Sequence, residues 1–171
     1  MERRDNRRSI NLGERFKTNN NGELQVIGWL DGGLYQVGFL STGYITKARG
    51  CKIKLGKVKD RLLPKVYNVG FLGNGEYSCK NESTLYSRWK HMLARCYSGK
   101  YPHYEECTVC DRWLNFQNFV KDAKNLPNYS DNLSGLDLDK DSIVVGNKIY
   151  SPATCQFLTR AENFKLALDR W

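Results

Sequence analysis

Residues 136–168 read LDLDKDSIVVGNKIYSPATCQFLTRAENFKLAL. Apolar and polar side chains alternate over residues 136–140, which predicts a short strand. Two short segments follow, Ile143-Val144-Val145 and Lys148-Ile149-Tyr150, and they flank Gly146-Asn147. That spacing predicts a β-hairpin with a two-residue turn.

A helix is expected directly after this hairpin. Thr159 to Glu162 read TRAE, the pattern of a capping box, in which the two end side chains bond to backbone N–H groups where a helix begins. Phe164 and Leu168 are expected on the buried side of that helix. The order of elements is therefore strand, hairpin and helix.

Two more helices are predicted upstream by the spacing of apolar residues. The first covers residues 83–98, with Ser83 as its N-cap and Gly99 as its stop signal. The second covers about residues 115–123. Together with the strand and hairpin, they predict an α+β domain over residues 81–171.

Residues 10–63 are expected to form a separate small β domain. Strand patterns at residues 23–30 and 34–39 flank the turn signal Asp31-Gly32-Gly33, and short alternating pieces continue to Lys54. A meander of this kind predicts a small barrel that resembles the Src-homology-3 type.

Three finer expectations follow from this pattern. Trp29 and Phe39 are expected to pack in the core of the barrel; the alternative is that exposed aromatics among Trp29, Tyr35, Phe39 and Tyr44 form a nucleic-acid surface beside the basic residues. Lys52 and Lys54 are expected to share one face of its last strand. Residues 64–80 contain one Pro, three Gly and two Asn, so they are expected to form a linker between the two domains.

The positive charge of the chain is concentrated in its first half. The whole chain has 27 Lys/Arg and 18 Asp/Glu, whereas residues 1–75 have 14 and 6, and residues 76–171 have 13 and 12. This asymmetry indicates a polyanionic partner, most commonly nucleic acid; the alternative is a basic surface without a ligand. The expected binding residues lie on a basic flexible arm, residues 1–9, and on the β domain: Arg3, Arg4, Arg7, Arg8, Lys47, Arg49, Lys52, Lys54, Lys57 and Lys59.

Membrane and secreted proteins are excluded by the pattern of the chain. It has no run of about 18 apolar residues, which a membrane-spanning helix requires. Its opening MERRDNRRS is charged and lacks the apolar region of a secretory signal. A soluble, cytoplasmic protein with reduced cysteines is therefore expected.

Residues 88–164 resemble phage-encoded endonuclease-like proteins of the HNH, or His-Me finger, type. The phrases that carry the resemblance are Arg88-Trp89 through Met92, Arg95-Cys96-Tyr97, Val109-Cys110-Asp111-Arg112-Trp113 with Phe116 and Phe119, Leu138-Asp139-Lys140-Asp141, Tyr150-Ser151-Pro152 with Cys155, and Glu162-Asn163. The resemblance implies a ββα fold and DNA, ahead of RNA, as the partner. It also implies a divalent Mg²⁺ or Mn²⁺ ion and the cytoplasm of an infected bacterium as the location.

In that family a histidine at the end of the first strand activates water, an asparagine orients it, and a further residue binds the metal. The resemblance assigns the asparagine to Asn163, or to Asn147, and the metal carboxylate to Asp139 or Asp141. No histidine matches the base, because Asp139 is followed by Lys140. Lysine is a poor general base near neutral pH, since its ordinary pKa is about 10.4.

Two hypotheses about function follow from the absence of a histidine at the position of the catalytic base. In the first, the chain nicks or cleaves DNA with a divalent metal, with Asp139, Asp141 and Asn163 at the site, Lys140 stabilising charge, and His91 or His103 as the base. In the second, the HNH-like domain is an inactive scaffold, and the chain binds nucleic acid or a host protein as an inhibitor or adaptor.

Four cysteines in the second half leave a further choice open. Cys107 and Cys110 have the spacing of a zinc knuckle, and they could be joined by Cys96, Cys155 or His103 in a structural zinc site. The alternative is that these are small buried thiols of the core.

Overall fold

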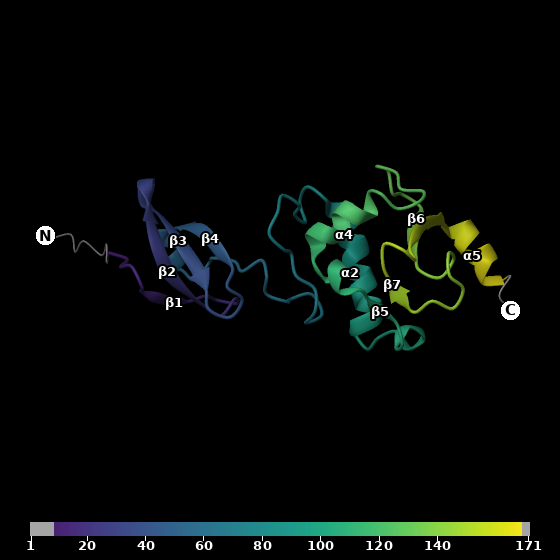
Figure 1. The fold of residues 1–171 in the computed structure, drawn as a ribbon, viewed down its shortest axis with the longest axis horizontal. Coiled ribbons are helices and arrows are strands. Elements are labelled where there is room, and N and C mark those ends of the chain that lie inside the picture. The colour runs from purple at the N-terminus through teal and green to yellow at the C-terminus, as the bar shows by residue number, and fades with distance from the viewer. Residues whose placement is uncertain (1–8, 169–171) are drawn as a thin grey trace, which may run out of the picture. The chain divides into compact units, whose positions relative to one another are not determined.

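The computed structural model describes residues 9–168 (Figure 1). Of the expected basic arm only Ser9 is described, so Arg3, Arg4, Arg7 and Arg8 lie outside the described residues. The chain divides into two compact units, with the division between Leu63 and Pro64. No helix among the described residues is long and apolar enough to cross a membrane.

The first unit is built on a four-stranded antiparallel sheet in the order β1-β2-β3-β4. Its strands are β1 (Arg15–Lys17), β2 (Glu23–Leu30), β3 (Leu34–Phe39) and β4 (Ile45–Arg49). A 3₁₀ turn, η1 (Asp31–Gly33), joins β2 to β3, and a short helix, α1 (Gly50–Lys54), follows β4. The core contains Leu24, Val26, Val37, Phe39, Tyr44, Ala48, Ile53 and Val58.

The barrel expected for this unit is not confirmed, because the sheet among the described residues is open. The segment that follows α1 is attached by side-chain hydrogen bonds instead of a fifth strand. The Asn21 side chain donates from Nδ2 to the Val58 carbonyl (3.3 Å) and accepts at Oδ1 from the Asp60 backbone N–H (3.1 Å). Asn21 and Asp60 are both buried, so this connection belongs to the core of the unit.

The expectation of a strand at residues 51–54 is wrong, because these residues form α1. Gly56 has a φ of 63° and ends the helix. Its N–H donates to the Ile53 carbonyl and that of Lys57 donates to the Lys52 carbonyl, which is a Schellman motif. Ile53 is buried while Lys52 and Lys54 are exposed. Both lysines are exposed, but the expectation that they share one face is wrong, because side chains two residues apart on a helix point about 200° apart.

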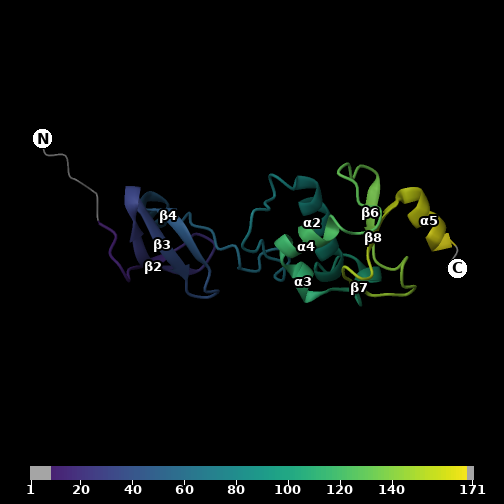
Figure 2. The ribbon, with the colours of Figure 1, turned by 45° about the horizontal axis from the view of Figure 1, so that its top comes forward.

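The second unit contains three helices in its first part and two small sheets (Figure 2). The helices are α2 (Ser83–Tyr97), α3 (Asp111–Leu114) and α4 (Phe116–Ala123), with a 3₁₀ turn, η2 (Pro102–Tyr104), after α2. β5 (Thr108–Val109) pairs in parallel with β7 (Ile149–Tyr150), and β6 (Leu136–Asp139) pairs antiparallel with β8 (Gln156–Thr159). The last helix is α5 (Arg160–Leu168). The largest buried side chains are Trp89, Trp113, Tyr150, Phe116, Phe119 and Phe157.

Residues 64–80 belong to this second unit and are not a free linker. Val66 pairs with Gly70, and Phe71 pairs with Asn115 at the start of α4. Gly70 lies so close to α2 that an added Cβ would be 2.9 Å from Cζ2 of Trp89. The glycines of this segment therefore permit close packing, which the sequence alone did not distinguish from flexibility.

The hairpin expected over residues 143–150 does not form. Residues 140–155 instead make a long loop between β6 and β8, and only Ile149 and Tyr150 of the expected hairpin are in a strand, paired with β5. Ile143, Val144 and Val145 are exposed. The antiparallel pair of this unit is thus β6 with β8, and α5 follows it directly.

The capping box at the start of α5 is confirmed. The Thr159 backbone N–H donates to the Glu162 carboxylate (2.8 Å), and the Glu162 N–H donates to the Thr159 hydroxyl (3.2 Å). The expected burial of Phe164 and Leu168 is wrong, since their exposed fractions are 66% and 59%. A helix at the end of a two-stranded sheet has too little surface beside it to cover these side chains.

Candidate functional site

A cleft of about 230 Å³ lies where β6, the following loop and α5 meet the C-terminal half of α2. Four of the residues expected at a site line it together: Asp139, Lys140, Asp141 and Asn163. The remaining lining residues are Arg95, Tyr104, Asp137, Leu138 and Tyr150. Residues from separate parts of the second unit therefore converge on one polar cleft.

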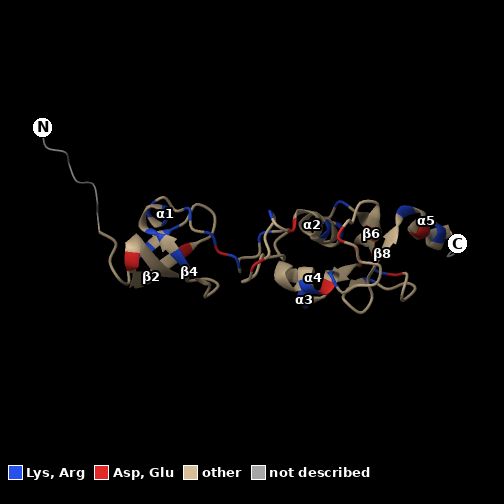
Figure 3. Cartoon of the chain, turned by 90° about the horizontal axis from the view of Figure 1, so that it is seen from above, with Lys and Arg blue, Asp and Glu red and all other residues tan. Residues whose placement is uncertain are grey.

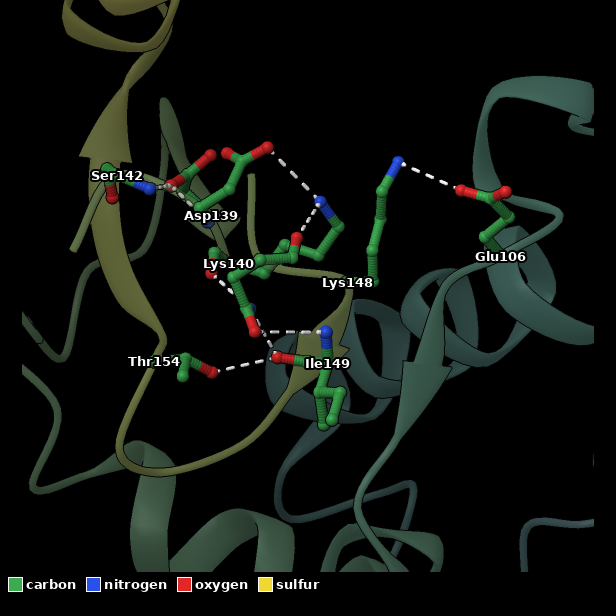
Figure 4. A network of polar contacts seen from close by, with 9 residues as sticks. Glu106, Asp139, Lys140, Ser142, Lys148, Ile149 and Thr154 are labelled. Atoms are coloured by element: carbon green, nitrogen blue, oxygen red, sulfur yellow. Dashed lines mark hydrogen bonds and ion pairs between the residues drawn. The ribbon is translucent and has the colours of Figure 1, made fainter. Parts of the chain in front are cut away.

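Lys140 is a buried charged side chain of this cleft whose amino group is fixed by hydrogen bonds. Its exposed fraction is 7%, and its Nζ donates to Oδ2 of Asp141 (3.2 Å) and to the carbonyl of Asn147 (3.0 Å; Figure 4). The same Nζ lies 5.9 Å from the ring centroids of Tyr104 and Tyr150. Lys140 thus acts as a hydrogen-bond donor, whereas a general base must accept a proton.

Asn147 completes this arrangement from the other side of the loop. Its Nδ2 donates to the carbonyls of Lys140 (2.7 Å) and Ile149 (2.6 Å), and its Oδ1 accepts from the Ile149 N–H (3.2 Å). All the hydrogen-bonding groups of this amide are engaged in closing the loop. Of the two asparagines that the resemblance proposed, Asn163 is therefore the one whose side chain faces the cleft.

Asp139 ends β6 and shapes the turn that follows. Its Oδ1 accepts from the backbone N–H groups of Asp141 (3.1 Å) and Ser142 (2.7 Å; Figure 4). Ser142 in turn accepts at its hydroxyl from Nε2 of Gln156 on β8 (2.9 Å). Asp139 is buried, so these bonds satisfy an oxygen that water does not reach freely.

The wall opposite the loop is cationic, and sequence reasoning missed it. Arg95 lies 5.4 Å above the Tyr104 ring centroid and donates to the Tyr150 hydroxyl. Burial is the main reason that the pKa of Tyr150 is raised, so its hydroxyl stays protonated. Arg88, His91 and Arg95 line an adjoining small cavity. Their spacing of three and four residues was the available signal, because it puts side chains on one face of a helix.

Asp137 neutralises part of this cationic wall. Its Oδ1 accepts from Arg88 at 2.8 Å, and its Oδ2 lies 3.7 Å from Nε of Arg160. Arg88 also donates to the carbonyl of Leu133 (3.2 Å). Asp137 therefore connects α2, β6 and the start of α5 through charge pairs.

The four cysteines considered for zinc do not gather into one site, with or without His103. Among residues 9–168 no three His, Cys, Asp or Glu side chains are grouped so that they could hold a metal ion. Burial raises the pKa of Cys96 and of Cys155 to about 12, which disfavours the thiolate that zinc binds. The geometry accords with the alternative of core thiols.

The divalent metal implied by the resemblance is also not matched by the present geometry. Asp139 Oδ1 already accepts two backbone bonds, and Asp141 Oδ2 accepts from Lys140. A catalytic divalent cation needs several free oxygen ligands. Asp139 and Asp141 therefore offer at most one further oxygen each, and within the described part of the chain no third His, Cys, Asp or Glu side chain is grouped with them to complete a metal site.

A second charged surface lies on the first unit, where β4, α1 and the next segment are rich in Lys and Arg (blue in Figure 3). Residues 47–59 contain six basic side chains and no acidic one, and all six are exposed: Lys47, Arg49, Lys52, Lys54, Lys57 and Lys59. We call these six residues the basic stretch.

Trp29 lies in the same unit, and its expected burial is wrong. Its exposed fraction is 69%, whereas Phe39 is buried as expected. Trp29 lies near the end of β2, beyond the buried residues Leu24 and Val26, where no core residue among those described covers it.

No family model, curated protein or solved structure matches this chain. Its function is therefore inferred from the residues and geometry described above.

Proposed function

We propose that this chain binds nucleic acid, DNA ahead of RNA, and that it does so without cleaving it. The observation that carries the proposal is the basic stretch, six exposed cations over residues 47–59 with no acidic residue among them. Exposed lysines and arginines attract phosphates whatever the base sequence, because binding releases the counterions condensed on the polyanion.

The second unit supports DNA as the partner through its resemblance to HNH-type proteins. β6, the loop, β8 and α5 follow the order of a ββα unit, and α5 directly follows β8. The residues taken from the resemblance, Asp139, Lys140, Asp141 and Asn163, line one cleft. The cationic wall formed by Arg88 and Arg95 is suited to a phosphate backbone.

The same cleft argues against cleavage. The residue in the position of the catalytic base, Lys140, donates hydrogen bonds to Asp141 and to the Asn147 carbonyl. Asp139 and Asp141 have oxygens engaged by the loop, as described above. We therefore infer an HNH-like scaffold that contributes to binding and lacks the chemistry of an endonuclease.

Metal-dependent nicking remains the second candidate, and one observation favours it. Asp139, Asp141 and Asn163 share a cleft, and His91 lines the cavity next to it. For this candidate, Asp139 and Asp141 would have to be released from their present bonds to hold Mg²⁺ or Mn²⁺. A base would also be needed from outside the position of Lys140.

The binding proposal is tested by removing charge in two places. The triple variant Lys52→Gln, Lys57→Gln, Lys59→Gln removes three cations of the basic stretch, and Lys80→Gln, Lys90→Gln, Lys100→Gln removes three exposed cations of the second unit. A gel-shift series on duplex DNA is run between about 50 and 200 mM salt. Each phosphate contact contributes about 0.9 to the magnitude of the slope of log K against log salt concentration. Removing three contacts in the first triple variant should therefore reduce the magnitude of this slope by about 2.7.

The second triple variant is the control for charge alone, since both variants carry the same net charge. We expect its slope to change by less than that of the first. Equal losses would show that binding depends on overall charge and not on the basic stretch. Absence of any salt-sensitive shift by the unmodified chain would refute nucleic-acid binding and would favour a protein partner.

A further inference from the structure

We propose that the first unit binds unpaired nucleotides, by stacking bases on Trp29 and Tyr35 while Arg49 and Lys54 contact the phosphates. This inference rests on the proposed function and specifies it, since it names single-stranded nucleic acid as the ligand of this unit. Four observations support it: the exposure of Trp29, its register with Tyr35, a groove beside Tyr35, and the charges that line that groove.

Trp29 is a large apolar side chain that the fold leaves in solvent. The other two tryptophans among the described residues, Trp89 and Trp113, are fully buried. An exposed tryptophan adds little to the stability of the unit, and an exposed aromatic ring offers a flat face to a planar ligand.

The β-bulge decides which face of the sheet Trp29 occupies. Val26 pairs with Val37, but Gly28 pairs with Gln36, so Ile27 is the extra residue of β2. Trp29 consequently pairs with Tyr35. Without the extra residue it would pair with Leu34 and lie on the opposite face, because side chains alternate along a strand.

The register therefore puts two aromatic side chains next to each other on one face. Residues directly opposite in an antiparallel pair have Cβ atoms about 5 Å apart. Tyr35 shares its face of β3 with the core residues Val37 and Phe39, but it is only partly buried. Trp29 and Tyr35 thus extend the core face outward into solvent as an aromatic platform.

A groove of about 380 Å³ begins at Tyr35. It is lined by Ser9, Ile10, Gly33, Tyr35, Arg49, Gly50, Cys51 and Lys54. Its volume falls within the range of small-molecule sites, about 300–1,000 Å³. Gly50 keeps it open, because a Cβ there would be 3.2 Å from both Ile10 Cδ1 and Tyr35 Cε2.

The charges of the groove favour an anion. Arg49 and Lys54 are its charged lining residues, and no acidic side chain of the described residues lines it. Cations that contact the phosphates, next to aromatic rings on which bases stack, are the combination by which proteins bind single strands of any sequence.

Single strands are favoured over duplexes as the ligand, because the rings of Trp29 and Tyr35 can stack only on the accessible face of an unpaired base. The faces of the bases in a duplex are covered by neighbouring base pairs, whereas an unpaired base can leave its neighbour and lie on an aromatic ring. A duplex would contact the basic stretch through its phosphates alone. The aromatic platform should therefore contribute to binding of single strands and not of duplexes.

The test compares single-stranded and duplex DNA with the full chain and its variants. Fluorescence anisotropy is measured with an oligothymidine of roughly 20 nucleotides, longer than the footprint of one small β domain, and with a duplex of the same length. The variants are Trp29→Ala and Trp29→Phe. Tyr101→Ala, which removes an exposed aromatic side chain of the second unit, is the control.

We expect Trp29→Ala to weaken binding of the single strand about tenfold, the loss typical of one stacked base. Trp29→Phe should retain most of the affinity, and Tyr101→Ala should retain all of it. Duplex affinity should stay unchanged in all three variants. The oligothymidine should also quench tryptophan fluorescence of the unmodified chain, and this quenching should be lost in Trp29→Phe.

The outcomes separate this inference from the function on which it rests. Unchanged single-strand affinity in Trp29→Ala, with salt-sensitive binding of both DNAs intact, would overturn the aromatic platform alone. Equal losses on single strand and duplex would also overturn it, since stacking would not be involved. Failure of the unmodified chain to bind either DNA would overturn nucleic-acid binding as a whole.

Discussion

Lys140 and Asn147 hold the loop between β6 and β8 closed by hydrogen bonds in both directions. The Lys140 Nζ donates to the Asn147 carbonyl at 3.0 Å, and the Asn147 Nδ2 donates to the Lys140 carbonyl at 2.7 Å. A lysine in this arrangement holds the loop in place. In this arrangement Lys140 is a hydrogen-bond donor that fixes the loop and is not placed to accept a proton.

Replacing Lys140 by methionine should destabilise the chain by about 2 kcal/mol, the usual contribution of hydrogen bonds to a charged group. The substitution removes the donor that the half-buried Asn147 carbonyl and Oδ2 of Asp141 share. Urea unfolding measures the change. Lys148→Met is the matched control, because Lys148 is half exposed and pairs with exposed Glu106 at 3.5 Å. Equal stability of the two variants would contradict the role given to Lys140.

The ionised Asp122 should stabilise the second unit fully above about pH 4 and progressively less below it. The Arg112 side chain is the main reason that the pKa of this carboxyl lies below its ordinary 3.8, and the Trp113 indole N–H also donates to it. A lowered pKa means that the stabilisation is present above the unfolded pKa and is lost as pH falls through the folded pKa.

Asp122→Asn keeps an oxygen for Trp113 and removes the charge. We expect the variant to be less stable than the unmodified chain at pH 7, with a difference that shrinks steadily below pH 4. Urea unfolding at a series of pH values measures it. A difference that stays constant over this range would show that the charge of Asp122 is not responsible.

Gly50→Ala should both strain the first unit and narrow its groove. The added Cβ would be 3.2 Å from Tyr35 Cε2 and from Ile10 Cδ1, a contact that forces these side chains to move. Overpacking of this kind costs about 1 kcal/mol. Single-strand affinity should fall as well, whereas Leu12→Ala, at an exposed side chain outside the groove lining, should change neither quantity. Normal stability in Gly50→Ala would contradict the tight packing.

The cysteines should divide into two classes by reactivity. Cys51 and Cys79 are exposed, whereas burial raises the pKa of Cys96 and Cys155 to about 12. A thiol reagent at pH 8 should therefore modify Cys51 and Cys79 quickly, and Cys96 and Cys155 only after denaturation. EDTA should leave the melting temperature unchanged. Stoichiometric zinc released by a mercurial reagent would refute the assignment of these cysteines to the core.

The elements that could be predicted from the sequence are those with local signals. The spacing of Leu85, Trp89 and Met92 indicated α2, and the TRAE pattern at residues 159–162 indicated the start of α5. Gly56 was also a local signal, because a glycine often follows the last residue of a helix. The alternation of apolar and polar residues over 51–54 instead favoured a strand there. In these places the interactions that form an element lie within a few residues of one another.

The failures involve partners distant in the sequence. Gly146-Asn147 has the form of a hairpin turn, but Ile149 and Tyr150 pair with β5, about forty residues away, and the loop is closed by Lys140. The face of the sheet on which Trp29 lies depends on a β-bulge at Ile27. The strand predicted over residues 23–30 did not include that bulge. In the site, Asp139, Lys140, Asp141 and Asn163 could be proposed from resemblance, but Arg95 and Tyr104 could not.

Binding without cleavage is tested most directly by incubating the chain with supercoiled plasmid in the presence of Mg²⁺ or Mn²⁺, with parallel samples in EDTA. Half of each sample is run on a native gel and half after removal of the protein. We predict a salt-sensitive retardation of the plasmid on the first gel and intact supercoiled DNA on the second. Metal-dependent conversion to nicked circles that is abolished by EDTA would contradict this prediction and would show that the cleft is active despite Lys140.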